Sequence, residues 1–382
     1  MTSVVSEQVW RGVHNLLDSY LELRAADRVV IAYTPDSRDA AAWVAVALQE
    51  RGMPSAALVG MQPIVDDSFE ARLLQALPAP ADLPPGGRAV LLCLERDTMS
   101  QTDVVRRAME RYDACATTAL RIINASPELF THALNHTQAD VSRLNAAVLN
   151  RLMGRHRLHI VSAQGTDLYA EIDSGRFSWI SNRGRANPGG AAILPAGEVA
   201  TYPAAIWGTL VADGAFNANV LTSLDARLTD HPVTVQIDDG MLADFECADP
   251  AVHRFIELCL TFPNSRRVGE LGFGTNDRLP GMVAMNSHIN ERAAGVHIGF
   301  GQHNQSLERV PYDCMLHLDL IAPGVTVWID KDPTPIEFSN LVPSDEPHPT
   351  DGVWDEDIVS DCCGLNRSDL SRHGGAVRFE PR

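Results

Sequence analysis

Short apolar strands alternate with helical stretches over the first 155 residues, and this alternation restricts the fold more than any other feature. Residues 28–34 form a β-branched run that ends at Pro35, and an Ala-rich helical stretch follows over residues 38–51. Strands joined by helices tend to lie parallel in one sheet, with the helices on its two faces. We therefore expect an α/β domain with a parallel sheet at residues 1–155, with further strands at 55–59, 88–94 and 117–123 and further helices at 7–24 and 103–111.

The turn after the first strand bears on whether such a sheet binds a nucleotide. Its sequence, Thr-Pro-Asp-Ser-Arg at residues 34–38, contains neither the glycines of a dinucleotide-binding loop nor the lysine of a P-loop. A proline-rich stretch at residues 77–87 is typical of a surface spacer. The sequence therefore predicts no nucleotide-binding loop in this domain.

The character of the chain changes after residue 155, where the strands become shorter and are interrupted by Gly, Pro, Asn and Asp. This pattern predicts a β-rich α+β domain at residues 156–341, with strands at 158–163, 167–173, 233–237 and 325–329. Residues 342–382 contain Ser-Asp-Glu-Pro and Asp-Glu-Asp segments, a composition typical of a solvated acidic tail. We therefore expect two folded domains followed by a C-terminal tail.

The charge balance limits the partners of the chain. Lys and Arg number 31 and Asp and Glu number 49, so the formal net charge is -18, and nucleic acids and anionic membranes are repelled. The chain contains no apolar run of about 18 residues, and its first residues lack the basic start and apolar core of a signal peptide. The seven scattered cysteines include no C-x-x-C pair and are typical of reduced thiols. We therefore expect a cytoplasmic protein that binds neither nucleic acid nor membranes.

An alternating segment late in the second domain carries two candidate metal ligands. In residues 312–320, three leucines occupy one face of the expected strand, and His317 and Asp319 occupy the other. An imidazole and a carboxylate at this spacing point the same way and can share one cation. A hydrogen-bonded structural pair has the same sequence, so this motif alone leaves both interpretations open.

Three further residues occur in similar settings. His297 lies opposite the apolar face of a V-H-I-G-F-G strand, whose glycines allow a ligand or another backbone to approach. Glu270 lies in the apolar, glycine-dense segment G-E-L-G-F-G, where its charge requires a cation, either an arginine or a metal. Glu198 lies at a turn that enters a strand, in P-A-G-E-V-A-T, where a surface position would have the same appearance. Each of these three motifs is weak evidence by itself.

The order of these motifs is more specific than any one of them. The succession G-T-D-L, G-E-V-x-T-x-P, G-E-L-G-F-G-T-N, G-V-H-I-G-F-G and H-L-D, within residues 162–330, resembles the M29 family of metallo-aminopeptidases. It is most similar to the shorter members, the leucyl aminopeptidase or thermophilic metalloprotease-like branch, and the N-terminal half agrees only in its α/β pattern. The resemblance implies a homodimer and a metal site formed by Glu198, Glu270, His297, His317 and Asp319.

The resemblance also implies a reaction. Three carboxylates and two imidazoles suit two divalent ions such as Zn, Co or Mn, with Glu270 as the bridging ligand and a water between the ions as the nucleophile. Glu198 and Glu270 are the catalytic carboxylates in this interpretation. The implied function is metal-dependent hydrolysis of an amide or peptide bond in a short peptide or small amide, because an enclosed dimer restricts the size of the substrate.

The chain departs from the family at two places. The segment Gln302–Ser306 stands where long members have a tyrosine after the ligand histidine, and residues 289–292 stand where short members tend to have Asp-Glu-Lys. We expect both changes to affect the substrate and to spare the metal. His288 and His303 either replace the lost groups or are ordinary loop histidines, and the second interpretation is simpler.

Two other functions remain open. The 2,5-dihydroxypyridine 5,6-dioxygenases resemble M29 proteins but bind one Fe(II) at a site of two histidines and one carboxylate, which here corresponds to His297, His317 and Asp319. That branch is expected to have a histidine in place of Glu270, and this chain keeps the glutamate. The other alternative is a non-catalytic biosynthetic partner protein that retains the fold, although the complete ligand set argues against it.

Overall fold

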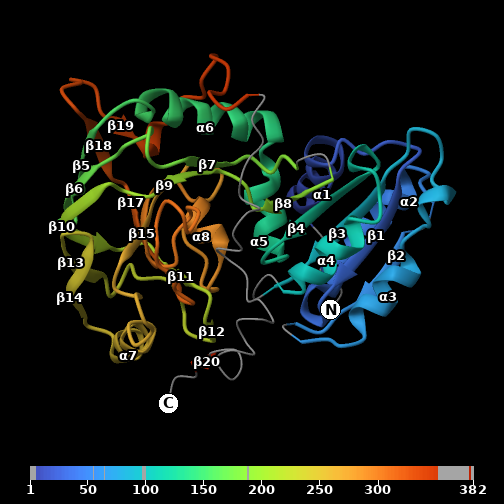
Figure 1. The fold of residues 1–382 in the computed structure, drawn as a ribbon, viewed down its shortest axis with the longest axis horizontal. Coiled ribbons are helices and arrows are strands. Elements are labelled where there is room, and N and C mark those ends of the chain that lie inside the picture. Colours follow the sequence, from blue (N-terminus) through green and yellow to red (C-terminus); the bar gives the residue numbers. More distant parts are fainter. Residues whose placement is uncertain are drawn as a thin grey trace. The chain divides into compact units, whose positions relative to one another are not determined.

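The computed structural model describes residues 6–54, 56–63, 65–96, 100–186, 189–351 and 378–379. The chain forms two compact units, and neither is one continuous stretch of sequence (Figure 1). Among the described residues, the first unit contains 6–139 and 183–196, and the second contains 140–182, 197–351 and 378–379. The Asp-Glu-Asp segment of the expected acidic tail lies outside the described residues.

A five-stranded parallel sheet forms the centre of the first unit. Its order is β2-β1-β3-β4-β8, and each neighbouring pair is parallel. Aliphatic side chains dominate because helices cover the sheet, and β3 and β4 are buried along their whole length. The expected α/β domain with a parallel sheet is confirmed; its strands are β1 (Arg28–Tyr33), β2 (Ala57–Gly60), β3 (Ala89–Leu94), β4 (Thr117–Ile122) and β8 (Ala191–Leu194).

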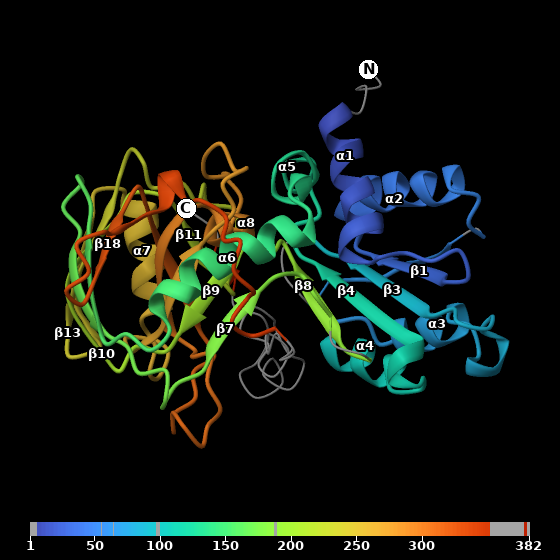
Figure 2. The same ribbon diagram turned by 90° about the horizontal axis from the view of Figure 1, so that it is seen from above.

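Helices lie on both faces of this sheet. Figure 2 shows α1 and α2 on one face and α3 and α4 on the other. Phe69 and Leu73 of α3 and Val105 of α4 pack with strand residues in one apolar core. The helices are α1 (Glu7–Asn15) with a π-helical continuation (Leu16–Tyr20), α2 (Arg38–Glu50), α3 (Phe69–Ala76), α4 (Thr102–Met109) and α5 (Pro127–Thr131), with short 3-10 turns at Pro35–Ser37, Pro80–Asp82, Ala114–Ala116 and Ala133–Asn135.

The division between the units differs from the single boundary expected at residue 155. Strand β8 pairs in parallel with β4 and so returns to the sheet of the first unit. Helix α6 (Gln138–Leu152) precedes that boundary, yet Val148, Leu149 and Leu152 are buried in the core of the second unit. Both features depend on contacts between distant segments, which a local sequence pattern does not contain.

Two antiparallel sheets form most of the second unit. Their strand orders are β14-β13-β10-β6-β5-β18-β19 and β11-β17-β16-β15-β9-β7. One large apolar core contains residues from both sheets and from α6 and α7. This arrangement confirms the expected β-rich second domain.

The bounds of the remaining elements complete the description. In the seven-stranded sheet they are β5 (Arg157–Val161), β6 (Asp167–Glu171), β10 (Ala205–Ala212), β13 (Val233–Asp238), β14 (Met241–Cys247), β18 (Thr326–Ile329) and β19 (Ile336–Glu337). In the six-stranded sheet they are β7 (Trp179–Asn182), β9 (Glu198–Thr201), β11 (Phe216–Ala218), β15 (Val268–Gly274), β16 (Gly295–Gly301) and β17 (His317–Pro323). A small pair joins β12 (Leu221–Thr222) to β20 (Arg378–Phe379), and the helices are α7 (Pro250–Cys259), α8 (His288–Arg292) and a 3-10 turn at Phe338–Asn340.

The central strands of the six-stranded sheet are buried on both faces. Every residue of β15 and β16 is buried, as is all of β17 except its last residue. The alternation expected over residues 312–320 begins only at His317, where β17 starts. Leu318 and Leu320 join the apolar core, so His317 and Asp319 point to the opposite face. That second face is polar and buried, which makes it the candidate site.

In the part of the chain that the structure describes, no helix is long and apolar enough to cross a membrane. The described cysteines at positions 93, 115, 247, 259 and 314 are free thiols, as the sequence predicts. Burial raises the pKa of Cys93 to about 12, so this thiol is unreactive at neutral pH.

A buried ion pair in the first unit gives a test of the fold. Arg121 Nη2 on β4 donates to Glu95 Oε1 at 2.6 Å, and the side chains of both residues are almost fully buried. We expect Arg121→Met to destabilise this unit by about 3–5 kcal/mol, because it leaves a buried carboxylate without its cation.

The matched control is Arg107→Met, which removes the exposed ion pair between Arg107 and Glu70, where the expected change is close to zero. Unfolding in urea, monitored by hydrogen exchange of the backbone amides in β3 and β4, measures the change in stability that each substitution causes. Equal effects of the two substitutions would contradict the assignment of a buried pair.

Candidate metal centre

The five residues predicted as metal ligands lie on four neighbouring strands of the six-stranded sheet. Glu198 begins β9, Glu270 lies in β15, His297 lies in β16, and His317 and Asp319 lie in β17. These strands follow one another in the order β17-β16-β15-β9. Adjacent strands are about 5 Å apart, so side chains on one face meet across them. The structure brings all five together, and all five are buried.

The five residues form two groups that share Glu270. In the first group, His297 Nε2 lies 2.9 Å from Glu198 Oε1 and 3.4 Å from Glu270 Oε1. In the second group, His317 Nε2 lies 3.0 Å from Asp319 Oδ2, and Glu270 is the third member. Within each group, one ligand atom per residue lies within 4.8 Å of the others. Nitrogen and oxygen atoms at such separations can surround one metal ion at about 2 Å from each.

Two glycines leave room for these side chains. Gly272 pairs directly with His297, and a Cβ at position 272 would lie 2.0 Å from His297 Nε2. Gly299 pairs with both Glu270 and Asp319, and a Cβ there would lie 2.9 Å from Glu270 Cβ and 3.0 Å from Asp319 Oδ1. The glycine-rich segments therefore serve the site, because only a hydrogen atom fits at these two positions.

Contacts with neighbouring charged groups shift the pKa values of Glu198, His297 and Asp319. Burial opposes the charge of Glu198, but Arg292 and His297 outweigh it and lower the pKa of Glu198. Burial also disfavours a charged His297, but the two neighbouring carboxylates raise the pKa of His297 well above its usual value. At Asp319, burial is outweighed by His317, and the pKa of Asp319 is lowered. Glu198 and Asp319 are therefore charged at neutral pH.

Asp319 lies against the His317 ring and the Glu291 carboxyl. Neither of its buried oxygens accepts a hydrogen bond from an amide, hydroxyl or guanidinium group of the described residues. A buried carboxylate without such partners is costly. A bound cation would supply the missing interaction.

Comparisons with known proteins identify the architecture. A family model described as crocagin biosynthetic protein CgnE/B matches residues 206–329, which include four of the five candidate ligands. The solved 2,5-dihydroxypyridine dioxygenase from Pseudomonas putida KT2440 is similar, with a TM-score of 0.59 and 15% sequence identity, and the match covers 89% of this chain and 98% of that chain. Wild-type AmpT from Thermus thermophilus has a TM-score of 0.57 and 16% identity, and the match covers 89% of this chain and all of that chain. The fold is shared with both. No curated protein sequence matches this chain.

Helix α8 brings two ionisable residues, Glu291 and Arg292, to the centre, and the motifs do not indicate either as part of it. Arg292 Nη1 donates to Glu198 Oε2 and, at 3.0 Å, to Glu291 Oε2. Asn217 Nδ2 donates to the other oxygen of Glu291. The change at residues 289–292 is expected from the sequence to spare the metal, whereas the structure puts Arg292 directly against a candidate ligand. A Glu-Arg pair at the end of a short helix has the sequence of a solvated surface, so no local pattern reveals it.

The segment Gln302–Ser306 also reaches the site. Asn304 Nδ2 donates to Glu270 Oε2 at 2.9 Å, and Gln305 Nε2 donates to Asn304 Oδ1 at 2.7 Å. These amides hold one oxygen of Glu270 and leave Oε1 facing His297. In the sequence this segment departs from the family pattern, but no motif there indicates a role for Asn304.

The two additional histidines have different surroundings. His303 Nδ1 accepts from the Gln305 amide at 3.2 Å, and its Nε2 donates to the Tyr312 carbonyl at 2.8 Å. Both ring nitrogens of His303 are thus used in local structure. Burial, followed by the charge of Arg292, lowers the pKa of His288 to about 3, so this ring is neutral at physiological pH.

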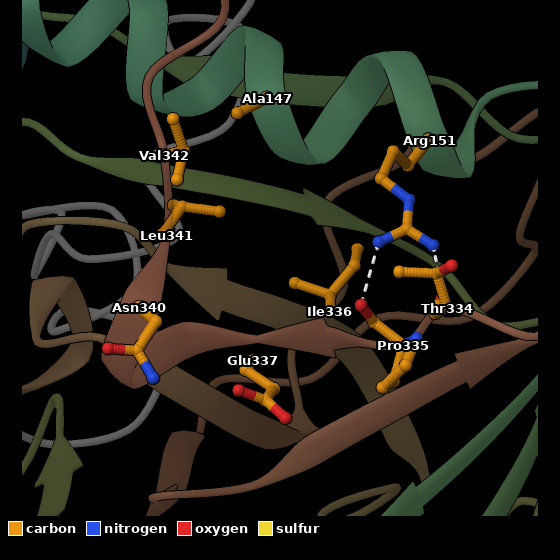
Figure 3. Close-up of a pocket in the computed structure, with 9 residues that line it drawn as sticks. All are labelled: Ala147, Arg151, Thr334, Pro335, Ile336, Glu337, Asn340, Leu341 and Val342. Atoms are coloured by element: carbon orange, nitrogen blue, oxygen red, sulfur yellow. Dashed lines mark hydrogen bonds between the residues drawn. The ribbon is translucent and has the colours of Figure 1, made fainter.

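Two cavities lie apart from the candidate ligands. The second unit contains a cavity of about 420 Å³ between α6 and the β19 segment. Arg151 and Pro335 are among its lining residues (Figure 3), and Arg151 Nη1 donates to the Pro335 carbonyl at 2.8 Å. In the first unit, a cavity of about 480 Å³ lies at the carboxyl ends of β1 and β2, where Arg72 pairs with Asp66. None of the five candidate ligands lines either cavity.

The close approach at Gly272 provides a test of the geometry. We expect Gly272→Ala to destabilise the protein by about 1–3 kcal/mol, because the new methyl group overlaps the His297 ring. Gly281→Ala is the control, since a Cβ at position 281 has no neighbour within 4 Å, and we expect a change within about 0.5 kcal/mol. Chemical denaturation measures both effects. Equal stabilities would mean that the His297 ring does not lie over Gly272.

Proposed function

We propose that this chain is a metal-dependent hydrolase that binds two divalent ions and cleaves an amide or peptide bond in a short peptide or small amide. The observation that carries the proposal is the pair of buried ligand groups, Glu198–Glu270–His297 and Glu270–His317–Asp319, which share one carboxylate. Two neighbouring metal ions are a common arrangement for metal-assisted hydrolysis.

Two further observations support this proposal. The order of motifs resembles that of M29 metallo-aminopeptidases, in which this reaction is expected, and the fold is shared with AmpT. The family model adds a setting, because its description is that of a biosynthetic protein. We infer that the substrate is a peptide-like intermediate in a biosynthetic reaction sequence.

The donor set fits Zn, Co or Mn. Carboxylate oxygens and imidazole nitrogens are suitable ligands for these ions. Three carboxylates offset most of the charge of two dications, and the buried oxygens of Asp319 lack hydrogen-bond donors among the described residues. When bound, the ions would lower the pKa of a shared water towards neutrality and polarise the carbonyl of the substrate.

The surrounding residues hold the ligands in position. Asn304 fixes one oxygen of Glu270, and Gly299 keeps the space between Glu270 and Asp319 open. Arg292 holds one oxygen of Glu198, so that the other faces His297. Such pre-organisation avoids reordering the ligands when substrate binds.

A second candidate function is favoured by the shared fold with 2,5-dihydroxypyridine dioxygenase. It would use one Fe(II) on His297, His317 and Asp319. The geometry gives this arrangement less support, because His297 groups with Glu198 and Glu270, whereas His317 groups with Asp319. Metal analysis separates the two functions.

The first experiment measures metal content. Metal-free protein equilibrated with an excess of Zn²⁺ or Co²⁺ should bind one ion per ligand group at saturation, which makes two per chain. His317→Ala should remove the ion of the second group and abolish hydrolysis of short peptides, because a ligand is lost. His253→Ala on the exposed face of α7 is the control and should change neither quantity. Full metal content and turnover in His317→Ala would refute the ligand assignment.

A second experiment uses the shared carboxylate. Glu270→Gln should reduce the binding of both ions and lower hydrolysis by several orders of magnitude, since a bridging ligand serves both. If a single iron is bound instead, Glu270 only neighbours the ligands, and its loss should cost about 10- to 100-fold. One iron per chain with oxygen uptake on an aromatic substrate would favour the dioxygenase. Protein that binds no metal would favour the non-catalytic biosynthetic partner.

A further inference from the structure

Arg292 makes the two halves of the candidate metal centre unequal. Its side chain is only 3% exposed, and Nη1 contacts one oxygen of Glu198 and one oxygen of Glu291. A guanidinium remains protonated at any pH at which the protein is folded. One permanent positive charge therefore lies against the Glu198–Glu270–His297 group.

The backbone around Arg292 is held firmly. Asn290 accepts from the Val283 amide at 2.8 Å and donates to the carbonyls of Val283 and Met285 at 3.1 and 3.2 Å. The Asn276 amide donates to the Arg292 carbonyl at 2.9 Å. These hydrogen bonds fix the backbone from which the Arg292 side chain reaches Glu198.

The other half of the centre has no such cation. Among the described residues, no arginine or lysine forms an ion pair with Glu270 or Asp319. The partners of the Asp319 carboxylate among these residues are the His317 ring, at 3.0 Å from Oδ2, and the Glu291 carboxyl, and neither carries a permanent positive charge. A divalent ion in this half meets carboxylate oxygens that no fixed positive charge has neutralised.

The difference has a direct electrostatic consequence. In a buried site of low dielectric constant, a dication close to a guanidinium is strongly repelled. At the Glu198 half, Arg292 already pairs with one carboxylate oxygen of Glu198. An incoming ion must therefore either bind the other oxygen, which faces His297, beside this positive charge or displace Arg292. At the Asp319 half, neither condition applies.

We propose that the Glu270–His317–Asp319 position binds its ion first, and that Arg292 weakens the Glu198–Glu270–His297 position, so that the second ion binds only at higher metal concentration. This inference rests on the proposed function, because it assigns an order of binding within the same centre. The chain holds one ion at low metal concentration and two at high concentration, and Arg292 sets the threshold between the two states.

The test is a titration of the metal-free full-length chain with Co²⁺ alone. Calorimetry and the absorption of the bound cobalt monitor the binding of each ion. The unaltered chain should show one tight and one weak ion, with affinities that differ by about 10- to 100-fold. Arg292→Gln should tighten the second ion towards the first and leave the first unchanged. Arg292→Lys keeps the positive charge and should keep the two ions unequal.

Two controls complete the experiment. Arg227→Gln removes an exposed arginine that pairs with Asp225 and should leave both affinities unchanged. Glu198→Gln keeps Arg292 and should lose the weak ion while retaining the tight one, which tests the order of binding even if Arg292→Gln fails to fold.

The outcomes separate this inference from the proposed function. Two equally tight ions in the unaltered chain, a second ion that does not respond to Arg292→Gln, or loss of the tight ion in Glu198→Gln would each overturn the inference and leave a two-metal hydrolase possible. The absence of any bound Co²⁺ in the unaltered chain and in all variants would overturn the proposed function together with it.

Discussion

Buried negative charge is the constraint on which the second unit depends. Three carboxylates lie on one closed face of the six-stranded sheet, where each needs a partner because burial makes an uncompensated charge costly. Each is compensated in a different way: Glu198 by Arg292, Glu270 by Asn304 and His297, and Asp319 by His317. Helix α8 and the loop after β16 both bring polar side chains to these carboxylates.

The register of the sheet links this chemistry to stability. In β15, β16 and β17, alternate residues enter the apolar core, while the residues between them form the candidate metal centre. A shift of one residue in any of these strands would bury the ligands in the apolar core and move the core residues to the centre. The direct pairing of Gly272 with His297 and of Gly299 with Asp319 adds a second restraint, because a larger residue at either position collides with a ligand. The same hydrogen-bond pattern therefore holds the core and aligns the ligands.

The shared fold does not decide the reaction. The 2,5-dihydroxypyridine dioxygenase and AmpT share the fold of this chain at similar TM-scores, and function depends on the site that a fold carries. In this chain, Glu270 belongs to both candidate ligand groups, with His297 in one and His317 in the other. The resemblance of the motifs and the grouping of the same residues in space both support the proposed hydrolysis. The buried Arg292 then makes the two halves of that centre differ.

Local sequence patterns predicted the class of each unit and the common face of His317 and Asp319, and the resemblance of the ordered motifs to the M29 family implied the set of five candidate ligands. The alternation of strand and helix predicts the parallel sheet around β1, and the alternation of leucine with His317 and Asp319 predicts their common face, because both patterns express the period of a single element. Tertiary structure alone decided that β8 returns to the first sheet, that Asn304 holds Glu270, and that Arg292 contacts Glu198 from 94 positions away in the chain. These contacts join elements that are distant in sequence, and burial turns an ordinary charged residue at the end of a short helix into part of the centre. The sequence records which side chains are present, but only packing decides which of them lose their water and must therefore meet.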